Sequence, residues 1–522
     1  MNTSCQHYPN RTNWLHIIAA LALAWFNRFV QDDAFISFRY AQNLAAGHGL
    51  VYNLGERVEG YTNFLWTVCM VPAFLLNADI VAWSYVLSLL AYAVTLLVTA
   101  RLALCWFRSP AAGFLAVILL ATNYSFSCYA TGGLETQFGI AWVLLSVWLL
   151  HIGRLVPAAL CSACAIMTRM DAILILFPFW CATASFGDML KGSPKHTFRV
   201  ILSASAGALL VVVWLVWRHH YYGAWLPNTF LIKGQGPTPL RGLCYAGLFY
   251  AVYGLWLLIP LFLKTPFSAN RPALYAILLW HVYIIAVGGD FMEFRMMMPS
   301  LPLAMIFVAG LLANPIHQKA RYAMPAVLAI ISLLFGMLRL DSRGGNNIHG
   351  LATFCAECRT LANEMGVLFG EQRESVKIAI TAAGTIPFYT QMPTLDLLGL
   401  NNQEVARTGE RLPHLKVFGN RPGHVRIAKP ETVIAENVNL LLNHPWVVEA
   451  DNDVLSWTAE RIAASWPYSR VPFQNGGVPV PPVIVWPLSD GRYWITLYMK
   501  PHPVIDAAIT RTGATVILPA HE

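Results

Sequence analysis

Two adjacent carboxylates, Asp32 and Asp33, directly follow the first long apolar run of the sequence. A carboxylate at a membrane–water boundary can take the proton of a hydroxyl group and act as a general base. Two neighbouring acids can push their pKa values apart, so that one is the base and the other a hydrogen-bond partner. The pair also suits a helix N-terminus, whose dipole favours negative charge. The sequence leaves open which acid would be the base.

Further charged residues lie in polar motifs between apolar runs. Arginine suits bidentate binding of a phosphate group, and Arg169 and Arg295 are the first candidates for it. A salt bridge from Arg169 to Asp171 and an interfacial anchor at Arg295 are the structural alternatives. The other candidate substrate-binding residues are Arg39, Glu59, Tyr61, Asn63, Glu135, Asn228, Lys233 and Asp290.

Several of these positions have an equally simple structural explanation. Tyr61 could stack on a ligand or belong to an aromatic belt at the membrane surface. Lys233 also fits an ordinary surface charge. Residues 288–289, a Gly-Gly pair, could let the backbone approach a ligand or could end a helix.

Histidine and cysteine spacings do not indicate a metal centre. His48, His219 and His220 lack metal-ligand spacing, so we predict no metal or other cofactor, with a divalent ion left open. Cys355 and Cys358 form a C-x-x-C pair. A redox role, a local disulfide and two reduced thiols remain alternatives for this pair.

The elements that position these residues follow from composition. The chain of 522 residues is 57% hydrophobic and only 12% charged, half the charged fraction of soluble domains. Lipid is therefore the expected main solvent, and the net charge of +8 is not a sign of nucleic-acid binding. Eleven apolar runs are long enough for membrane spans, and residues 63–76 suit a helix at the interface. The spans are expected near residues 13–30, 80–104, 110–128, 134–151, 155–169, 171–186, 198–217, 243–263, 272–288, 297–313 and 322–339.

Charge gives these spans a direction. Alternate connections carry nearly all the basic residues, whereas the acids gather in the opposite set. By the positive-inside rule, the N-terminus is cytoplasmic, the first outside loop covers residues 31–79, and the C-terminal part lies outside. We therefore predict a mostly α, polytopic transmembrane domain at residues 1–340. Residues 341–522 are predicted to form a small extracytoplasmic α/β domain, with strands near 376–381, 394–400, 483–486 and 493–499.

The polar motifs together resemble one family of membrane enzymes. They occupy residues 31–66, 131–136, 168–171, 221–229, 288–295 and, more weakly, 396–401. This set is similar to the bacterial GT-C glycosyltransferases, in the branch of the mycobacterial terminal arabinofuranosyltransferase and the pilin arabinosyltransferases. The resemblance implies a GT-C-like fold in the bacterial inner membrane, with one first-loop carboxylate as the catalytic base and Glu135 at a second acidic position.

The same resemblance implies a reaction. The sugar, expected to be arabinofuranose, would pass from a polyprenyl-phosphate donor to a hydroxyl group of an envelope glycan, glycolipid or pilin at the outer face of the membrane. Transfer of a mannose- or aminoarabinose-type sugar is the alternative within the enzyme class. A lipid-linked sugar transporter or flippase is the alternative outside it. A transporter favours related halves and charges at the membrane midplane, and the sequence contains no such repeat.

Overall fold

The computed structural model describes residues 14–184, 194–233, 238–263, 270–339, 346–412, 423–468, 470–473 and 478–520. The chain forms two compact units. Unit 1 comprises residues 1–30, 62–223 and 236–350, and unit 2 comprises residues 31–61, 224–235 and 351–522. Two segments from the membrane part of the sequence thus belong to the compact unit that holds the C-terminal residues. The domain boundary predicted at residues 340–341 lies outside the described residues and stays a prediction.

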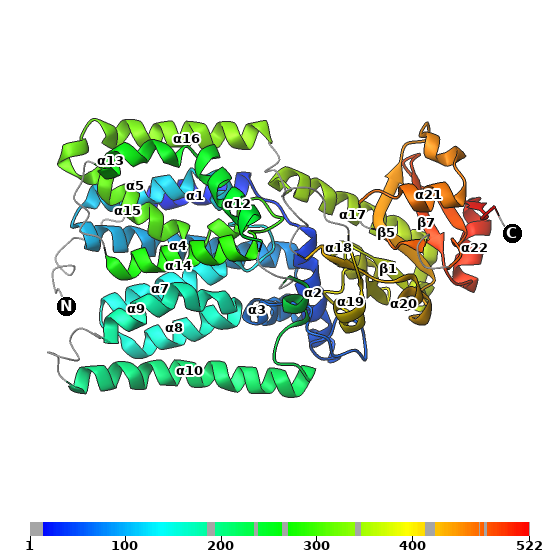
Figure 1. Cartoon of the computed structure of the whole chain (residues 1–522), viewed down its shortest axis with the longest axis horizontal. Helices are drawn as coiled ribbons and strands as arrows, with labels where there is room; N and C mark the ends of the chain where they lie inside the picture. Colours follow the sequence, from blue (N-terminus) through cyan, green and yellow to red (C-terminus); the bar gives the residue numbers. More distant parts are fainter. Residues whose placement is uncertain are drawn as a thin grey trace. The chain divides into compact units, whose positions relative to one another are not determined.

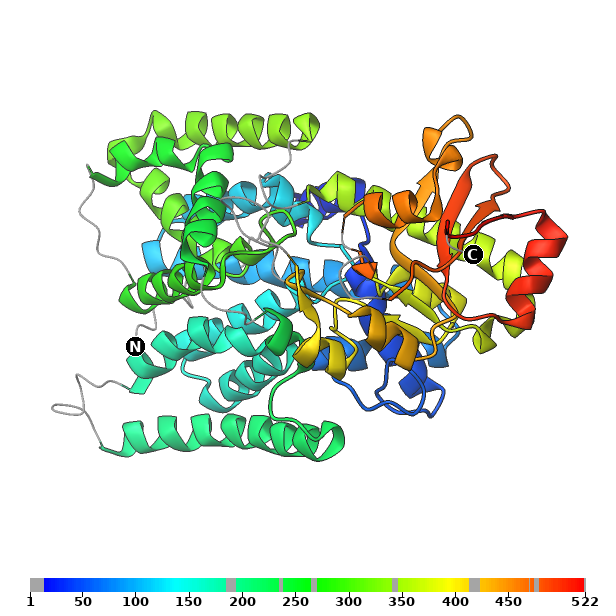
Figure 2. The ribbon, with the colours of Figure 1, turned by 45° about the vertical axis from the view of Figure 1, so that its right-hand side comes forward.

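Unit 1 is a bundle of apolar helices. Its long helices run side by side in both views (Figure 1, Figure 2). Helix α4 packs against α5 and α7, α7 packs against α8, and α8 packs against α10. The helices are α1 (Trp14–Phe26), α3 (Phe64–Leu75), α4 (Ile80–Phe107), α5 (Pro110–Ala121), α6 (Tyr124–Cys128), α7 (Thr136–His151), α8 (Leu155–Thr168), α9 (Ile173–Ala184), α10 (Pro194–Tyr222), α12 (Pro239–Val252), α13 (Ile259–Leu263), α14 (Arg271–Val287), α15 (Leu301–Ala313) and α16 (Ala320–Leu338).

Apolar side chains cover the outside of this bundle. The most apolar window of α10 is only 17% buried, although a soluble protein would hide such a surface. Within the described residues, three helices are long and apolar enough to cross a membrane, or four if a bent pair counts as one span. Eight further apolar helices are shorter. Each predicted span contains an apolar helix, but the count of eleven crossings stays a prediction.

Two predicted spans are interrupted. The run at residues 110–128 breaks after Ala121 into α5 and α6, because Asn123 caps a new helix by accepting from the backbone N–H of Phe126. The run at 243–263 bends by 72° after α12. Gly254, with a φ of +64°, makes that bend, since L-residues with a Cβ rarely adopt this conformation.

Unit 2 is a three-layer α/β/α structure. Its six-stranded sheet has the order β2-β1-β5-β7-β6-β8, with β2, β1 and β5 parallel and the remaining pairs antiparallel. The strands are β1 (Ile378–Ile380), β2 (Thr394–Asp396), β5 (Leu440–Val448), β6 (Val483–Pro487), β7 (Tyr493–Tyr498) and β8 (Thr515–Ile517), and β3 (Glu410–Arg411) pairs separately with β4 (Arg426–Ile427). The predicted small α/β fold of the C-terminal residues is confirmed.

The side chains of each strand alternate between two cores. Ile378 and Ile380 face a core formed with α17 (Ile348–Phe369) and α22 (Pro503–Thr512). Ala379 faces the opposite core, which α19 (Gln403–Thr408), α20 (Pro430–Ala435) and α21 (Ala459–Ser465) complete. This period of two is what a sheet covered on both faces requires. The remaining helices of the unit are α2 (Asp32–Ala45), α11 (Asn228–Lys233) and α18 (Thr385–Thr390).

Candidate functional site

The carboxylate pair begins helix α2, and the β1–α18 turn holds its first member. One oxygen of Asp32 accepts from the backbone N–H of Thr385 at 2.7 Å, and the other accepts from that of Gly384 at 3.1 Å. A Cβ at position 384 would lie 1.9 Å from the main-chain oxygen of Asp32, so only glycine permits this approach. Asp33 is half-buried on the next position of the helix.

The surroundings of Asp32 move its pKa toward neutral pH. Burial raises the pKa of Asp32 to about 6, and the neighbouring Asp33 raises it further by like charge, while the hydrogen bonds from Thr385 and Gly384 oppose the rise. A carboxylate with this pKa is ionised at pH 7 and still basic enough to take a proton. Its two backbone donors fix its orientation and leave each oxygen a second lone pair.

Arg39, two turns along α2, binds the other end of α18. Its guanidinium donates to the backbone carbonyls of Pro387 and Met392, each at 2.9 Å, and to that of Tyr52 at 2.8 Å. A carboxylate at the N-terminus and a cation at the C-terminus both complement the dipole of a helix. Asp32 and Arg39 therefore hold α18 at its two ends. These contacts favour a positioning role for Arg39, and the predicted binding role stays a prediction.

Residues 51–61 and α11 attach to the same unit. The side chain of Asn53 donates to the carbonyl of Thr394 at 2.8 Å and accepts from its N–H at 3.1 Å, as a neighbouring strand would. The side-chain amide of Asn228 donates to the carbonyls of Gly399, Leu400 and Asn402. The backbone N–H of Asn228 donates to the carbonyl of Glu59 at 2.9 Å. Tyr61 packs edge-on against Tyr40.

The motif at residues 396–401 is the loop that α2 and α11 contact. Asp396, at the end of β2, accepts from the N–H groups of Leu398, Gly399 and Asn401. Asn401 in turn accepts from the hydroxyl of Tyr40 at 3.2 Å. Burial raises the pKa of Asp396 to about 6 despite these hydrogen bonds. The family-like motif at residues 396–401 therefore contacts the segment at residues 31–61 within unit 2.

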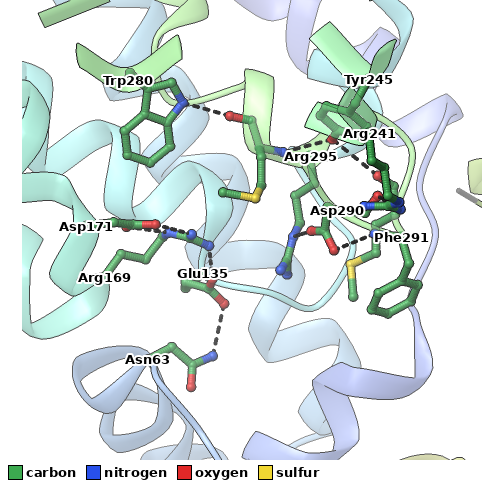
Figure 3. A network of polar contacts seen from close by, with 12 residues as sticks. Asn63, Glu135, Arg169, Asp171, Arg241, Tyr245, Trp280, Asp290, Phe291 and Arg295 are labelled. Atoms are coloured by element: carbon green, nitrogen blue, oxygen red, sulfur yellow. Dashed lines mark hydrogen bonds and ion pairs between the residues drawn. The ribbon is translucent and has the colours of Figure 1, made fainter. Parts of the chain in front are cut away.

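Unit 1 contains a second cluster of predicted site residues (Figure 3). Glu135, which precedes α7, accepts from Arg169 at 3.0 Å and from the side-chain amide of Asn63 at 3.0 Å. Asp171 binds Arg169 through both carboxylate oxygens, at 3.0 and 2.6 Å. The salt bridge that we considered as an alternative for Arg169 is thus present, and all three guanidinium nitrogens of this residue are engaged.

Arg295 makes different use of its guanidinium. Its Nε donates to Asp290 at 2.9 Å, and its two terminal nitrogens make no hydrogen bond to any residue that the structure describes. The side chain is 11% exposed, so these donors are held in a largely desolvated place. Such a pre-oriented pair of N–H donors matches the oxygens of a phosphate group.

The loop that carries Arg295 is built around backbone conformations of positive φ. Gly288 ends α14 with a φ of +85°, and its Cβ would collide with Thr238, so the Gly-Gly pair ends a helix. Phe294 also has a positive φ, +45°, and is fully buried. Arg241 from α12 donates to the carbonyls of Gly288 and Asp290 and fixes the loop from the other side.

The structure therefore divides the predicted site residues between the two units. Unit 1 holds Asn63, Glu135, Arg169, Asp290 and Arg295, and unit 2 holds Asp32, Asp33, Arg39, Glu59, Tyr61 and Asn228. Lys233 ends α11, but its side chain lies outside the described residues. Sequence reasoning missed Gly384 and Thr385, although a strand followed by glycine and a helix start is typical of anion-binding turns. It also missed Arg241, for which no local signal exists.

Cysteine and metal-ligand predictions can also be compared with the described residues. Cys355 and Cys358 are both buried free thiols on α17, which agrees with the reduced alternative. In the described ranges, no three His, Cys, Asp or Glu side chains are grouped so that they could hold a metal ion. The absence of a cofactor stays a prediction.

Comparison with known sequences places this chain beside arabinofuranosyltransferases. It is 28% identical over 350 residues to a terminal β-(1→2)-arabinofuranosyltransferase of Mycobacterium tuberculosis, a match covering 55% of this chain and 54% of the relative. The protein of the same name from Corynebacterium glutamicum is 28% identical over 362 residues, covering 58% and 51%. The chain thus matches about half the length of these relatives. A family model described as a domain of unknown function (DUF8728) matches residues 352–498.

Comparison with solved structures identifies the fold. The structure of ArnT from Cupriavidus metallidurans bound to undecaprenyl phosphate aligns with a TM-score of 0.54 and 13% identity, covering 93% of this chain and 98% of ArnT. The apo form of ArnT aligns with a TM-score of 0.55 and 12% identity, covering 95% and 100%. The predicted resemblance to GT-C membrane glycosyltransferases of the arabinosyltransferase branch is confirmed.

Proposed function

We propose that this protein is a glycosyltransferase that moves an arabinofuranose-type sugar from a polyprenyl-phosphate donor to a hydroxyl group of a cell-envelope glycoconjugate, at the outer face of the inner membrane. The observation that carries this proposal is the carboxylate of Asp32, oriented by two backbone N–H groups and with its pKa raised to about 6. The similarity to terminal arabinofuranosyltransferases supports the choice of sugar.

In the proposed reaction, the acceptor hydroxyl attacks the anomeric carbon of the donor. The bond between this carbon and the phosphate oxygen breaks, and the polyprenyl phosphate leaves with the electron pair. Asp32 takes the proton of the hydroxyl, a contribution of about 10²- to 10⁴-fold to the rate. Burial raises the pKa of Asp32, and the like charge of Asp33 raises it further. A phosphate is already a good leaving group, so it needs cations rather than an acid.

Arg295 is the proposed phosphate ligand. The terminal nitrogens of Arg295 can donate two parallel hydrogen bonds to the phosphate, whereas Asp171 and Glu135 already engage three of the five N–H donors of Arg169 and balance its charge. The role proposed for Arg169, Glu135 and Asn63 is structural, because they bind one another. This division of roles separates two arginines that the sequence could not distinguish.

The test is turnover by the purified full-length protein in lipid nanodiscs. Synthetic polyprenyl-phosphoryl arabinofuranose and an octyl arabinofuranosyl trisaccharide are supplied, and both polyprenyl phosphate release and the extended glycan are measured. We expect transfer by the wild type and its loss in Asp32→Asn. Transfer only from a mannose- or aminoarabinose-type donor would show that the sugar is wrong. Movement of intact donor across a liposome membrane, without a new glycosidic bond, would refute the enzyme proposal.

A further inference from the structure

Three aromatic rings stack at the surface of unit 2. Phe354 on α17 lies parallel to His444, with ring centroids 5.0 Å apart. The ring of Tyr468 packs edge-to-face against the ring of His444, with centroids 4.6 Å apart. Tyr468 is 77% exposed, whereas large aromatic side chains are usually mostly buried. We call Phe354, His444 and Tyr468 the aromatic platform.

The backbone is irregular at two residues of this platform, His444 and Tyr468. His444 lies in the irregular middle of β5, where the register to β7 shifts between Leu441 and Trp446. Tyr468 has a φ of +61°, a left-handed conformation that costs a non-glycine residue about 1–2 kcal/mol. The buried indole of Trp466 donates to the carbonyl of His444 at 2.8 Å and fastens the two segments together. The exposed ring of Tyr468 contributes little to the stability of the fold, so it does not offset the cost of the left-handed backbone. Strained residues of this kind are concentrated at functional sites, which indicates a function for the ring.

Contacts made by the chain neighbours of Phe354 and His444 connect the aromatic platform to the surroundings of Asp32, within the same unit. Asn443, which precedes His444, accepts from the N–H of Thr381 directly after β1. Cys355, which follows Phe354, contacts the hydroxyl of Thr385 at 3.4 Å, and the N–H of Thr385 binds Asp32. Both features therefore stand at the carboxyl ends of the parallel strands, the edge at which open α/β sheets bind ligands.

We propose that the aromatic platform binds the glycan chain of the acceptor. This inference rests on the proposed function, because it assigns the place where that reaction holds its second substrate. The electron-rich faces of Phe354 and Tyr468 attract the C–H groups of a sugar ring, which makes a saccharide the ligand that this platform suits. A neutral saccharide, extended along the platform, can bring its terminal hydroxyl toward Asp32.

The experiment measures binding of the octyl arabinofuranosyl trisaccharide to the full-length protein by calorimetry, without donor, together with its KM in the transfer reaction. The variant is Tyr468→Gly, because glycine accepts a φ of +61° without strain. We expect a melting temperature equal to or above that of the wild type and about three- to tenfold weaker glycan binding. The KM for the trisaccharide should rise by the same factor, with the KM for the donor unchanged.

Two controls define the role of the ring. Tyr468→Phe keeps the ring and should keep binding, and Val367→Ala removes another exposed apolar side chain of unit 2 and should change nothing. A large loss of melting temperature in Tyr468→Gly, or wild-type glycan binding by that variant, would overturn the proposal. Ring-dependent glycan binding without turnover of any donor would uphold the platform and overturn the proposed function. Sugar transfer together with glycan binding that does not depend on the ring of Tyr468 would uphold the proposed function and overturn the platform.

Discussion

Replacing Asp33 by asparagine should move the acidic limb of the pH–activity profile to lower pH without abolishing transfer. The carboxylate of Asp32 must be ionised to act as a base, so activity falls as the pH drops through its pKa of about 6. Asp33 contributes to that pKa through like charge. Removing the charge of Asp33 therefore lowers the pKa of Asp32, while burial still keeps it above the ordinary value.

The expected size of the shift follows from Coulomb's law. With roughly 6 Å between neighbouring carboxylates and an effective dielectric constant of about 40, the repulsion is about 1.4 kcal/mol, or about one pKa unit. At pH 5, the ionised fraction of Asp32 would rise from about 9% to about 50%, whereas at pH 7 it is roughly 90% or more in both proteins. Relative to its own plateau, the variant should be about fivefold more active at pH 5.

The assay is kcat/KM for transfer from polyprenyl-phosphoryl arabinofuranose between pH 4.5 and pH 8. Asp33→Glu is the matched control, since it keeps the charge and should keep the limb near pH 6. Asp32→Asn should lose activity at every pH. An inactive Asp33→Asn beside an active Asp32→Asn would show that the two roles are exchanged. An active variant whose acidic limb does not move would refute the electrostatic reasoning.

Three further predictions concern the supports of the two clusters. Arg295→Lys should lower kcat/KM for the donor by about 10- to 100-fold, because a lysine cannot make the bidentate contact, and steady-state kinetics with varied donor will measure it. Gly384→Ala should destabilise unit 2 by about 2 kcal/mol or more through collision with Asp32, seen as a lower melting temperature; unchanged melting would contradict the close approach. Residues 351–522 expressed alone should unfold without a cooperative transition, and a synthetic peptide of residues 31–61 should restore one in circular dichroism melts.

Local pattern was enough to find most elements of the fold. The apolar run at 80–104 became α4 (Ile80–Phe107), and the strand predicted at 483–486 became β6 (Val483–Pro487). Such elements are visible because a long apolar run or a β-branched run carries its own signal. The longest strand, β5 (Leu440–Val448), was missed, since Asn443, His444 and Pro445 interrupt its apolar pattern at the irregular register.

The candidate site could be predicted as a set of residues but not as an arrangement. The motifs pointed to Asp32, Glu135 and Arg295, because unusual polar residues beside apolar runs are visible in one dimension. The partner of Asp32 is Thr385, 353 residues away, and no local pattern encodes that pairing. For the same reason, the sequence could not show that Asp171 and Glu135 both bind the guanidinium of Arg169.

The attachment of α2 to α18 also determines when the surroundings of Asp32 can form during synthesis of the chain. Asp32 leaves the ribosome early, but its partners Gly384 and Thr385 are made more than 350 residues later. At about 5–20 residues per second, roughly 20–70 s separate the two events. Throughout that interval α2 has no α18 to bind, and the side chain of Asp32 lacks the two donors that orient it. A ribosome-bound or truncated chain that ends before Gly384 would therefore lack both backbone donors that orient the carboxylate of Asp32.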